Sequence, residues 1–228
     1  MNNLIRPLMA EFVGTCLFVF LGAASVVASS GTGNTIGAVG VATAHGLALA
    51  ILVTATMRIS GGHLNPAVTL GLLAIGKTDG RTAGAYIGAQ LVGAIVGALL
   101  VKLLYPAGPA AVMSLGAPGV ANNVTFVQAT SIEAVLTFFL MSAVLGTAVS
   151  SDAPAVGGFG IGLAVTVGAL VGGPLTGAAL NPARAFGPAL VAGDLQAQAI
   201  YWIGPILGAV AAAFVWKLVL LPKDPARI

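Results

Sequence analysis

The sequence contains very little charge. Of its 228 residues, 9 are Lys or Arg and 6 are Asp or Glu, so charged residues make up 7% of the chain, while 58% are hydrophobic. A water-soluble domain usually has about a quarter of its residues charged. The scarcity excludes a soluble globular domain and predicts a polytopic membrane protein. No run of basic residues accompanies the net charge of +3, so nucleic acid is not expected as a partner.

Cysteine and histidine are also scarce. Cys16 is the single Cys, which excludes a disulfide within the chain. The two His residues form no cluster with Cys that would hold a metal, and no nucleophile stands with a base and an orienting acid. No Gly-rich phosphate loop precedes a Lys. The sequence therefore predicts a protein that is not an enzyme, with no catalytic residue, no metal and no cofactor.

Long apolar runs are what the sequence has in quantity. A run of about 20 apolar residues is long enough for a helix that crosses a bilayer. The connections between the runs are short and rich in turn-forming residues, apart from one long loop at 105–123. These features predict an all-α membrane protein with a single membrane domain over residues 1–228. The six runs lie at about 8–29, 37–57, 82–104, 127–149, 155–171 and 199–220.

Two further apolar stretches, 66–75 and 182–191, are too short to cross a membrane. Each begins at the Pro of an Asn-Pro-Ala triplet. Pro is favoured in the first turn of a helix, and Asn directly before it is a good N-cap. The triplets therefore predict the starts of two half-helices. They are Asn65, Pro66 and Ala67 in the first copy, and Asn181, Pro182 and Ala183 in the second.

The two halves of the sequence repeat one another. Each copy, about 8–104 and 127–220, holds three spans and one half-helix. Because three is an odd number, the second copy must be inverted in the membrane relative to the first. Landmarks of the two copies match in the same order: Glu11 with Glu133, Asn65 with Asn181, and Tyr86 with Tyr201.

The charges predict the orientation of the chain. Most Lys and Arg residues fall on the side shared by both termini, which the positive-inside rule assigns to the cytoplasm. Lys102 is the exception among the loops. We therefore expect a multi-pass protein of the cell (inner) membrane with both termini cytoplasmic. The cations on that side are Arg6, Arg58, Lys77, Arg81, Lys217, Lys223 and Arg227.

Inversion makes the half-helices enter from opposite sides, so that their N-termini meet near the bilayer centre. Non-helical backbone at that depth must be buried in protein or line a watery cavity, which predicts a pore. Two facing helix N-termini oppose cations. The Asn65 and Asn181 oxygens would cap the half-helices and leave the amide nitrogens free to face passing water. Arg184, a cation at membrane depth, marks the permeation path.

These motifs resemble the major intrinsic protein family, the aquaporins and glycerol facilitators. The resemblance covers nearly the whole chain through "AEFVGT", "SGGHLNPAVT", "GAYIGAQLVGA", "NPARAFGPAL" and "YWIGPILGA". It points to the water-channel branch, with prokaryote-like features and a His typical of plant vacuolar members. It implies six tilted helices with two half-helices, and a homotetramer in which each protomer, surrounded by lipid bilayer, has its own pore.

The resemblance also places four residues in an outer constriction, the selectivity filter: His45, Ala169, Ala178 and Arg184. Water-selective members commonly carry an aromatic residue at position 45 and a larger one at 169. Two Ala residues predict a wider opening. A His at position 45 resembles the plant vacuolar subgroup, which passes water together with ammonia, urea or peroxide. If it faces the lumen it predicts a pH response; the alternative is a His packed between helices against a carbonyl.

Three further residues are interpreted as supports of the re-entrant loops. Glu11 and Glu133 resemble the family's buried glutamates, which accept hydrogen bonds from these loops and pin them. His63 is interpreted as a scaffold residue of the cytoplasmic loop rather than a gate. A proton relay through the two glutamates is disfavoured because no further acid lies within the spans to continue it.

The sequence thus predicts a passive channel for water, and for ammonia, urea, hydrogen peroxide or glycerol, that excludes protons and ions. Two alternatives stay open: a glycerol or urea facilitator as the main role, and a structural membrane protein with a vestigial pore. Against the first stand Ala185 and Ala189, where the glycerol branch has Asp and Lys. Against an ion channel or proton-coupled transporter stands the lack of charged positions along the path other than Arg184.

Overall fold

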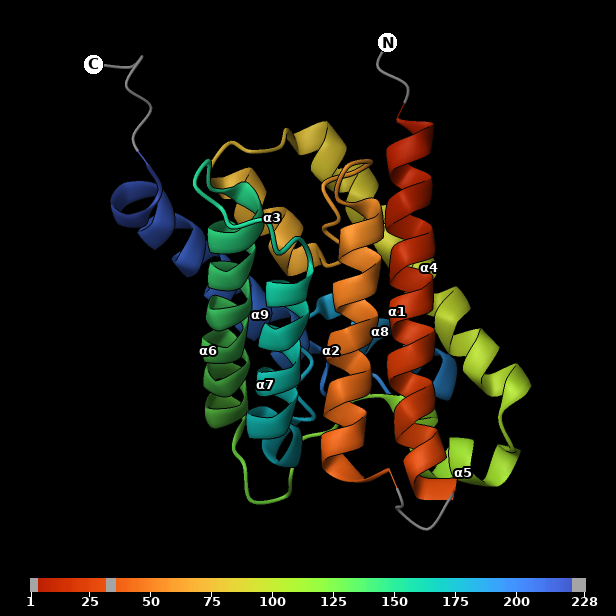
Figure 1. Cartoon of the computed structure of the whole chain (residues 1–228). Coiled ribbons are helices and arrows are strands. Elements are labelled where there is room, and N and C mark those ends of the chain that lie inside the picture. The colour runs from red at the N-terminus through yellow and green to blue at the C-terminus, as the bar shows by residue number, and fades with distance from the viewer. Residues whose placement is uncertain (1–3, 32–35, 223–228) are drawn as a thin grey trace.

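The structure, a computed structural model, describes residues 4–31 and 36–222, and every regular element in that part of the chain is helical. Six of these helices are long and apolar enough to cross a membrane, which confirms the predicted fold class. They pack side by side, and the start of α1 and the end of α9 lie at the same end of the molecule (Figure 1). The six are α1 (Ile5–Gly31), α2 (Gly37–Thr56), α4 (Gly80–Leu104), α6 (Phe126–Val144), α7 (Phe159–Thr176) and α9 (Gln198–Val215).

The two half-helices are α3 (Pro66–Ala74) and α8 (Pro182–Ala192), each starting at the Pro that the triplets predict. Each packs against the last span of the other half of the chain: α3 against α9, and α8 against α4. Glycine makes this contact close. A Cβ at Gly71 would lie 3.1 Å from the Ala209 carbonyl oxygen, and one at Gly187 would collide with the Ala94 carbonyl. The half-helices thereby lock the two halves of the sequence together.

Two boundaries differ from the sequence-based expectation. The fifth span was expected at 155–171, but α7 begins four residues later and runs through Pro174 to Thr176. Its last turn persists because the Thr176 hydroxyl donates to Glu133 of α6, and Gly177 then ends the helix in the left-handed region at φ 73°. The loop 105–123 is not irregular throughout. It contains a short helix α5 (Ala107–Val112) and a 3₁₀ turn η1 (Ser114–Gly116).

The ends of α6 and α9 also differ from regular α-helix. Each continues into one π-helical turn, η2 (Leu145–Val149) after α6 and η3 (Trp216–Leu220) after α9. The two turns contact one another, because Gly146 leaves space for the Trp216 ring. Lys217 of η3 reaches back to donate to the Ile75 carbonyl oxygen at the end of α3, 3.3 Å away. This contact ties the end of the last span to the first half-helix.

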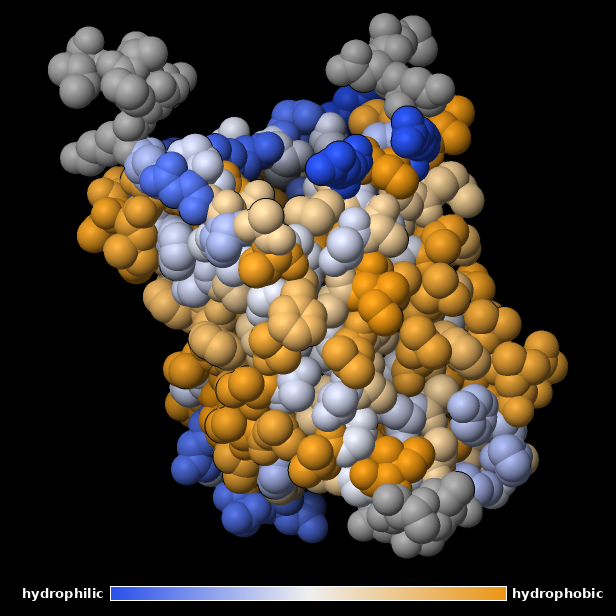
Figure 2. All heavy atoms as spheres, viewed as in Figure 1, coloured by the Kyte–Doolittle hydropathy of each residue, from blue (hydrophilic) through white to orange (hydrophobic). Residues whose placement is uncertain are grey.

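The surface is arranged as a membrane protein requires. Hydrophilic residues gather at the two ends of the molecule, and hydrophobic residues cover the flanks between them (Figure 2). Arg6, Arg58, Lys77, Arg81 and Lys217 lie at the end where α1 begins, as the order of the helices dictates. Lys223 and Arg227 are outside the described residues. The chain is a multi-pass membrane protein.

Candidate pore

The two triplets lie close together, because each Asn side chain bonds the residue that precedes the other triplet. Asn65 Oδ1 accepts from the Ala67 amide at 2.8 Å, and Asn181 Oδ1 accepts from the Ala183 amide at 3.0 Å. Both Asn residues therefore act as N-caps. Their Nδ2 atoms cross over: Asn65 donates to the Leu180 carbonyl at 2.9 Å, and Asn181 donates to the Leu64 carbonyl at 2.8 Å.

These crossed bonds correct one expectation. The Asn amide nitrogens are not free, since each already donates one hydrogen to the opposite loop. An amide nitrogen has two hydrogens, so one remains on each Asn for a molecule in the pore. The crossed bonds fix the direction of that second hydrogen. Together with the N-cap bonds, they orient each Asn amide group more strictly than the caps alone would.

Both loops reach this geometry through backbone that side chains rarely adopt. Leu64 has φ 48° and Leu180 has φ 52°, in the left-handed region. Such a conformation costs about 1–2 kcal/mol for a residue with a Cβ. It turns the two Leu carbonyls toward the opposite Asn, and it is offset by hydrogen bonds that buried carboxylates accept from the same two residues. The strain is thus part of how the loops are built.

The carboxylates are Glu11 on α1 and Glu133 on α6, both fully buried. Glu133 accepts from the Thr176 hydroxyl at 2.7 Å and from the Ala179 and Leu180 amides at 2.9 and 2.8 Å. The first half repeats the pattern. Glu11 accepts from the Ser60 hydroxyl at 2.6 Å and from the His63 and Leu64 amides at 3.0 and 2.7 Å. Each glutamate holds the loop of its own half.

The structure adds supports that the sequence reasoning did not assign. Tyr86 donates to the Ser60 carbonyl at 3.0 Å, and Tyr201 donates to the Thr176 carbonyl at 2.7 Å, so each loop is held by a matched Tyr. The repeat had already paired these Tyr residues, and that pairing was the available signal. Gln90 is a further case: its Nε2 donates to Glu11 at 2.8 Å and to the Thr69 hydroxyl at 3.0 Å.

His63 lies in the loop before α3. Its Nδ1 is 3.1 Å from the Thr69 hydroxyl, and its ring meets the Tyr86 ring edge-on at a centroid distance of 5.1 Å. The side chain also lines a cavity of about 260 Å³, together with Lys77 and Met57, at the end where α1 begins. His63 is thus bound to the scaffold and borders a cavity at the same time.

A larger cavity of about 720 Å³ lies on the other side of the Asn pair. It reaches from Ser29 and Gly37, at the ends of α1 and α2, down to Asn65 and Asn181. The four residues expected in the filter all line it, so the structure brings them together around one space. They are His45 on α2, Ala169 on α7, Ala178 in the second re-entrant loop and Arg184 on α8.

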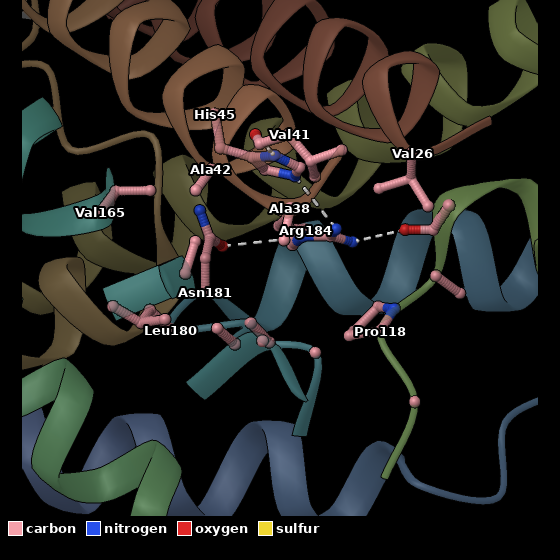
Figure 3. Close-up of a pocket in the computed structure, with 18 of the residues that line it drawn as sticks. Val26, Ala38, Val41, Ala42, His45, Pro118, Val165, Leu180, Asn181 and Arg184 are labelled. Atoms are coloured by element: carbon pink, nitrogen blue, oxygen red, sulfur yellow. Dashed lines mark hydrogen bonds between the residues drawn. The ribbon is translucent and has the colours of Figure 1, made fainter. Parts of the chain in front are cut away.

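Arg184 is the single charged side chain among the residues that line this cavity, and it is 4% exposed. Its Nη1 donates to the Gly116 carbonyl at 2.9 Å, and its backbone amide donates to Asn181 Oδ1 at 3.3 Å. Its Nη2 lies 3.1 Å from His45 Nε2, and the two side chains point toward one another across the pocket (Figure 3). The carbonyl comes from η1, a segment the sequence analysis treated as part of a loop.

The partners of His45 fix its chemical form. Arg184 can only donate a hydrogen bond, so His45 Nε2 must accept. The proton then resides on Nδ1, which donates to the Val41 carbonyl at 2.9 Å. Both alternatives in the sequence analysis therefore hold, since His45 lines the cavity and also bonds a helix carbonyl. These two contacts favour the neutral imidazole in this geometry, and the pH response expected of His45 stays a prediction.

The arrangement favours neutral molecules. The N-termini of α3 and α8 face one another at the Asn pair, and each contributes about half a positive charge at the end of its helix dipole. Arg184 adds a further positive charge to the lining of the same cavity. A neutral molecule with an oxygen acceptor finds N–H donors at Arg184 and at the two Asn residues.

Six spans around two facing half-helices, with a cavity that leads to their junction, define a membrane channel of the aquaporin type. The sequence pattern of the family described as Major intrinsic protein matches residues 1–216. The chain belongs to this family, whose members are passive channels and not enzymes. They carry water and small solutes across membranes.

Individual relatives agree with the family assignment. Aquaporin TIP4-4 from Zea mays is 43% identical over 221 residues, which cover 93% of this chain and 85% of that protein. Nodulin-26 from Glycine max is 38% identical, with 97% and 80% covered. The X-ray structure of the aquaglyceroporin from Plasmodium falciparum superposes with a TM-score of 0.85 at 25% identity, covering 95% of this chain and 96% of that one.

Proposed function

We propose that this chain is a passive channel that conducts water together with small neutral solutes such as ammonia, urea, hydrogen peroxide or glycerol, and that excludes protons and ions. One observation carries the solute range. The four residues of the filter line the same cavity, and two of them, Ala169 and Ala178, are Ala. Their methyl groups leave His45 and Arg184 as the large side chains of the constriction, and a wide opening admits more than single water molecules.

The proposed roles follow from the contacts. Asn65 and Asn181 orient a passing molecule with the amide hydrogens that the crossed bonds leave available. Arg184 donates to a solute oxygen at the constriction and repels cations. Glu11 and Glu133 hold the two loops so that the Asn residues keep their positions, and His63 braces the first loop beside the smaller cavity.

A facilitator specialised for glycerol or urea is the second candidate. The small Ala169 and Ala178 favour it, while Ala185 and Ala189, both buried in α8, are where the sequence analysis expects Asp and Lys in that branch. A structural protein with a vestigial pore is disfavoured, because both caps, both carboxylates and the lining of the large cavity are intact.

We further propose that the protein resides in the cell membrane with both termini in the cytoplasm. The support is the position of Arg6, Arg58, Lys77, Arg81 and Lys217 at one end of the bundle, since the positive-inside rule orients such an end to the cytoplasm. We also propose a homotetramer, as is typical of the family, with one pore in each protomer.

A panel of solutes tests the function. Purified protein in liposomes is challenged by stopped-flow mixing with gradients of sucrose, glycerol, urea, ammonia and hydrogen peroxide, beside empty liposomes. The proposal expects faster water flow than in empty liposomes and faster entry of at least one solute larger than water. Entry of glycerol or urea with little water flow would favour the facilitator. Flux equal to that of empty liposomes throughout would support the structural role.

A further inference from the structure

Gly22 of α1 lies directly behind the filter, although it contacts no solute path itself. One face of α1 borders the large cavity through Phe18, Val26 and Ser29. Residues four apart lie on the same face of a helix, so Gly22 belongs to this face as well. It is nevertheless buried and does not line the cavity. The side chain that covers it is His45.

The fit between Gly22 and His45 leaves no space for a side chain. A Cβ at position 22 would lie 2.6 Å from both Cδ2 and Nε2 of the His45 ring, well inside the contact distance of about 3.5–4.0 Å for heavy atoms. The ring has little freedom to give way. It is held by the Val41 carbonyl at one nitrogen and by Arg184 at the other, and the Phe18 ring meets it edge-on at 6.2 Å.

The position of the His45 imidazole therefore depends on the lack of a side chain at position 22. With Gly, the ring sits against the backbone of α1, and its Nε2 is in reach of Arg184. With any larger residue, the ring would have to move by about 1 Å away from α1, toward the cavity, to restore normal contact. Because Nε2 is one of the two closest atoms, the same movement would change its bond to Arg184.

We propose that Gly22 is a specificity-determining residue of this channel, which sets the width of the filter by letting His45 retract against α1 and hold Arg184. This inference rests on the proposed function, because it concerns the solutes admitted by the same constriction. It adds a position outside the four filter residues, on a helix that contributes none of them.

The test compares Gly22→Ala with Gly88→Ala in proteoliposomes, using urea and water flux per inserted channel. Gly88 lies on α4, where a Cβ would meet nothing within 4 Å, so it controls for the chemical change. We expect Gly22→Ala to lower the ratio of urea flux to water flux about tenfold. This lies within the range of discrimination that one added or missing carbon produces in a closed site. Gly88→Ala should leave the ratio unchanged. An equal ratio in both variants would overturn the inference.

Repeating Gly22→Ala in a channel that also carries His45→Ala shows whether the added methyl group acts through the His45 ring or through a general change in helix packing. Without the imidazole, adding Gly22→Ala should change the flux ratio by less than about twofold, because coupled residues lose their separate effects in a double-mutant cycle. A full drop in that background would contradict the inference. If Gly22→Ala alone fails to insert, recovery of insertion in the double variant supports the clash with the ring. Continued failure in the double variant contradicts it.

The same variants distinguish failure of the inference from failure of the proposed function. If the unchanged channel passes water but no larger solute, the proposed solute range is wrong. The inference then predicts that Gly22→Ala lowers water flux itself when His45 is present and has no effect when His45 is Ala. Any other pattern would refute it.

Discussion

At the residue scale, the proposed selectivity depends on a few polar atoms in a chain of which only 7% of the residues are charged. Arg184 is kept buried by one carbonyl and one imidazole nitrogen, and the Asn pair keeps two amide hydrogens in fixed directions. A buried cation without such partners would be costly. Ala169 and Ala178 line the same cavity with small methyl groups, so changes at the two Ala positions should be the most informative.

Ala178→Cys should make water flow sensitive to mercurials, while the unchanged channel should be insensitive. Ala178 lines the large cavity, where a bound mercury ion would block the path. The natural thiol, Cys16, is 7% exposed and lies where α1 packs against Gly93 and Gly97 of α4. Stopped-flow water permeability with and without mercuric chloride, followed by reversal with a thiol, measures both cases. Strong inhibition of the unchanged channel would show that Cys16 controls the path.

Ala169→His should reduce urea or ammonia flux much more than water flux. A His side chain adds bulk to the cavity that His45 also lines and so removes space, but it offers a hydrogen-bond partner that a single water molecule can use. Loss of solute flux by about tenfold, with water flux within about twofold of the unchanged channel, is the expected order. Val167→Ala, at an exposed position of α7, is the control. Unchanged ratios in Ala169→His would mean that position 169 does not border the constriction.

At the scale of single elements, the half-helices depend on contacts that their short length cannot supply. Helices of 9 and 11 residues are marginal by themselves, so packing and caps must hold them. The caps are Asn65 and Asn181, and the packing is against α9 and α4. The loops before them are held by hydrogen bonds to two buried glutamates, Glu11 and Glu133. The half-helices are therefore only as stable as these few contacts.

Glu133→Gln should destabilise the second loop and lower water flux. The carboxylate accepts three hydrogen bonds, and an amide replaces one acceptor oxygen with an NH₂ that faces the same donors. Leaving a buried donor unsatisfied costs on the order of 1–3 kcal/mol. Thermal unfolding in detergent and water permeability in liposomes measure the loss. Asp152→Asn makes the same change in an exposed turn and should be neutral; equal behaviour of the two variants would contradict a supporting role for Glu133.

Gly97→Ala should weaken the contact between α1 and α4, whereas Gly88→Ala on the same helix should not. A Cβ at Gly97 would lie 2.5 Å from the Cys16 carbonyl oxygen, and one at Gly88 meets nothing within 4 Å. Overpacking costs roughly 1–3 kcal/mol, while Ala in a helix is favoured over Gly by roughly 0.5–1 kcal/mol. The midpoints of thermal unfolding in detergent should move in opposite directions. A fall of similar size in both would count against this account of the helix contact.

Much of the fold could be predicted because hydrophobic length and the repeated triplets act locally. Apolar runs set the spans, and Asn followed by Pro sets the start of a half-helix. The end of α7 could not be predicted, because Thr176 is held there by Glu133, a residue on another helix. Likewise, the choice of Gly116 as a partner of Arg184 depends on a left-handed turn in η1 that has no clear sequence signal.

At the scale of the whole molecule, two inverted halves place equivalent groups on opposite sides of one plane. The crossed bonds between Asn65 and Leu180 and between Asn181 and Leu64 are the clearest expression of this symmetry. The two halves differ in the residues and cavities next to their re-entrant loops. The second loop leads to Arg184 and a cavity of about 720 Å³, and the first leads to His63 and a cavity of about 260 Å³. The helix N-termini face one another where the two loops meet. Their positive ends are the basis of the proposal that uncharged molecules pass and protons do not.

Simultaneous measurement of osmotic water flow and proton flux in the same proteoliposomes tests this claim most directly. Water permeability is recorded by light scattering, and internal pH by a trapped dye, over a range of protein densities. The account predicts water permeability that rises in proportion to density while proton flux stays at the level of empty liposomes. A proton or ionic current that rises with density alongside the water flow would contradict it.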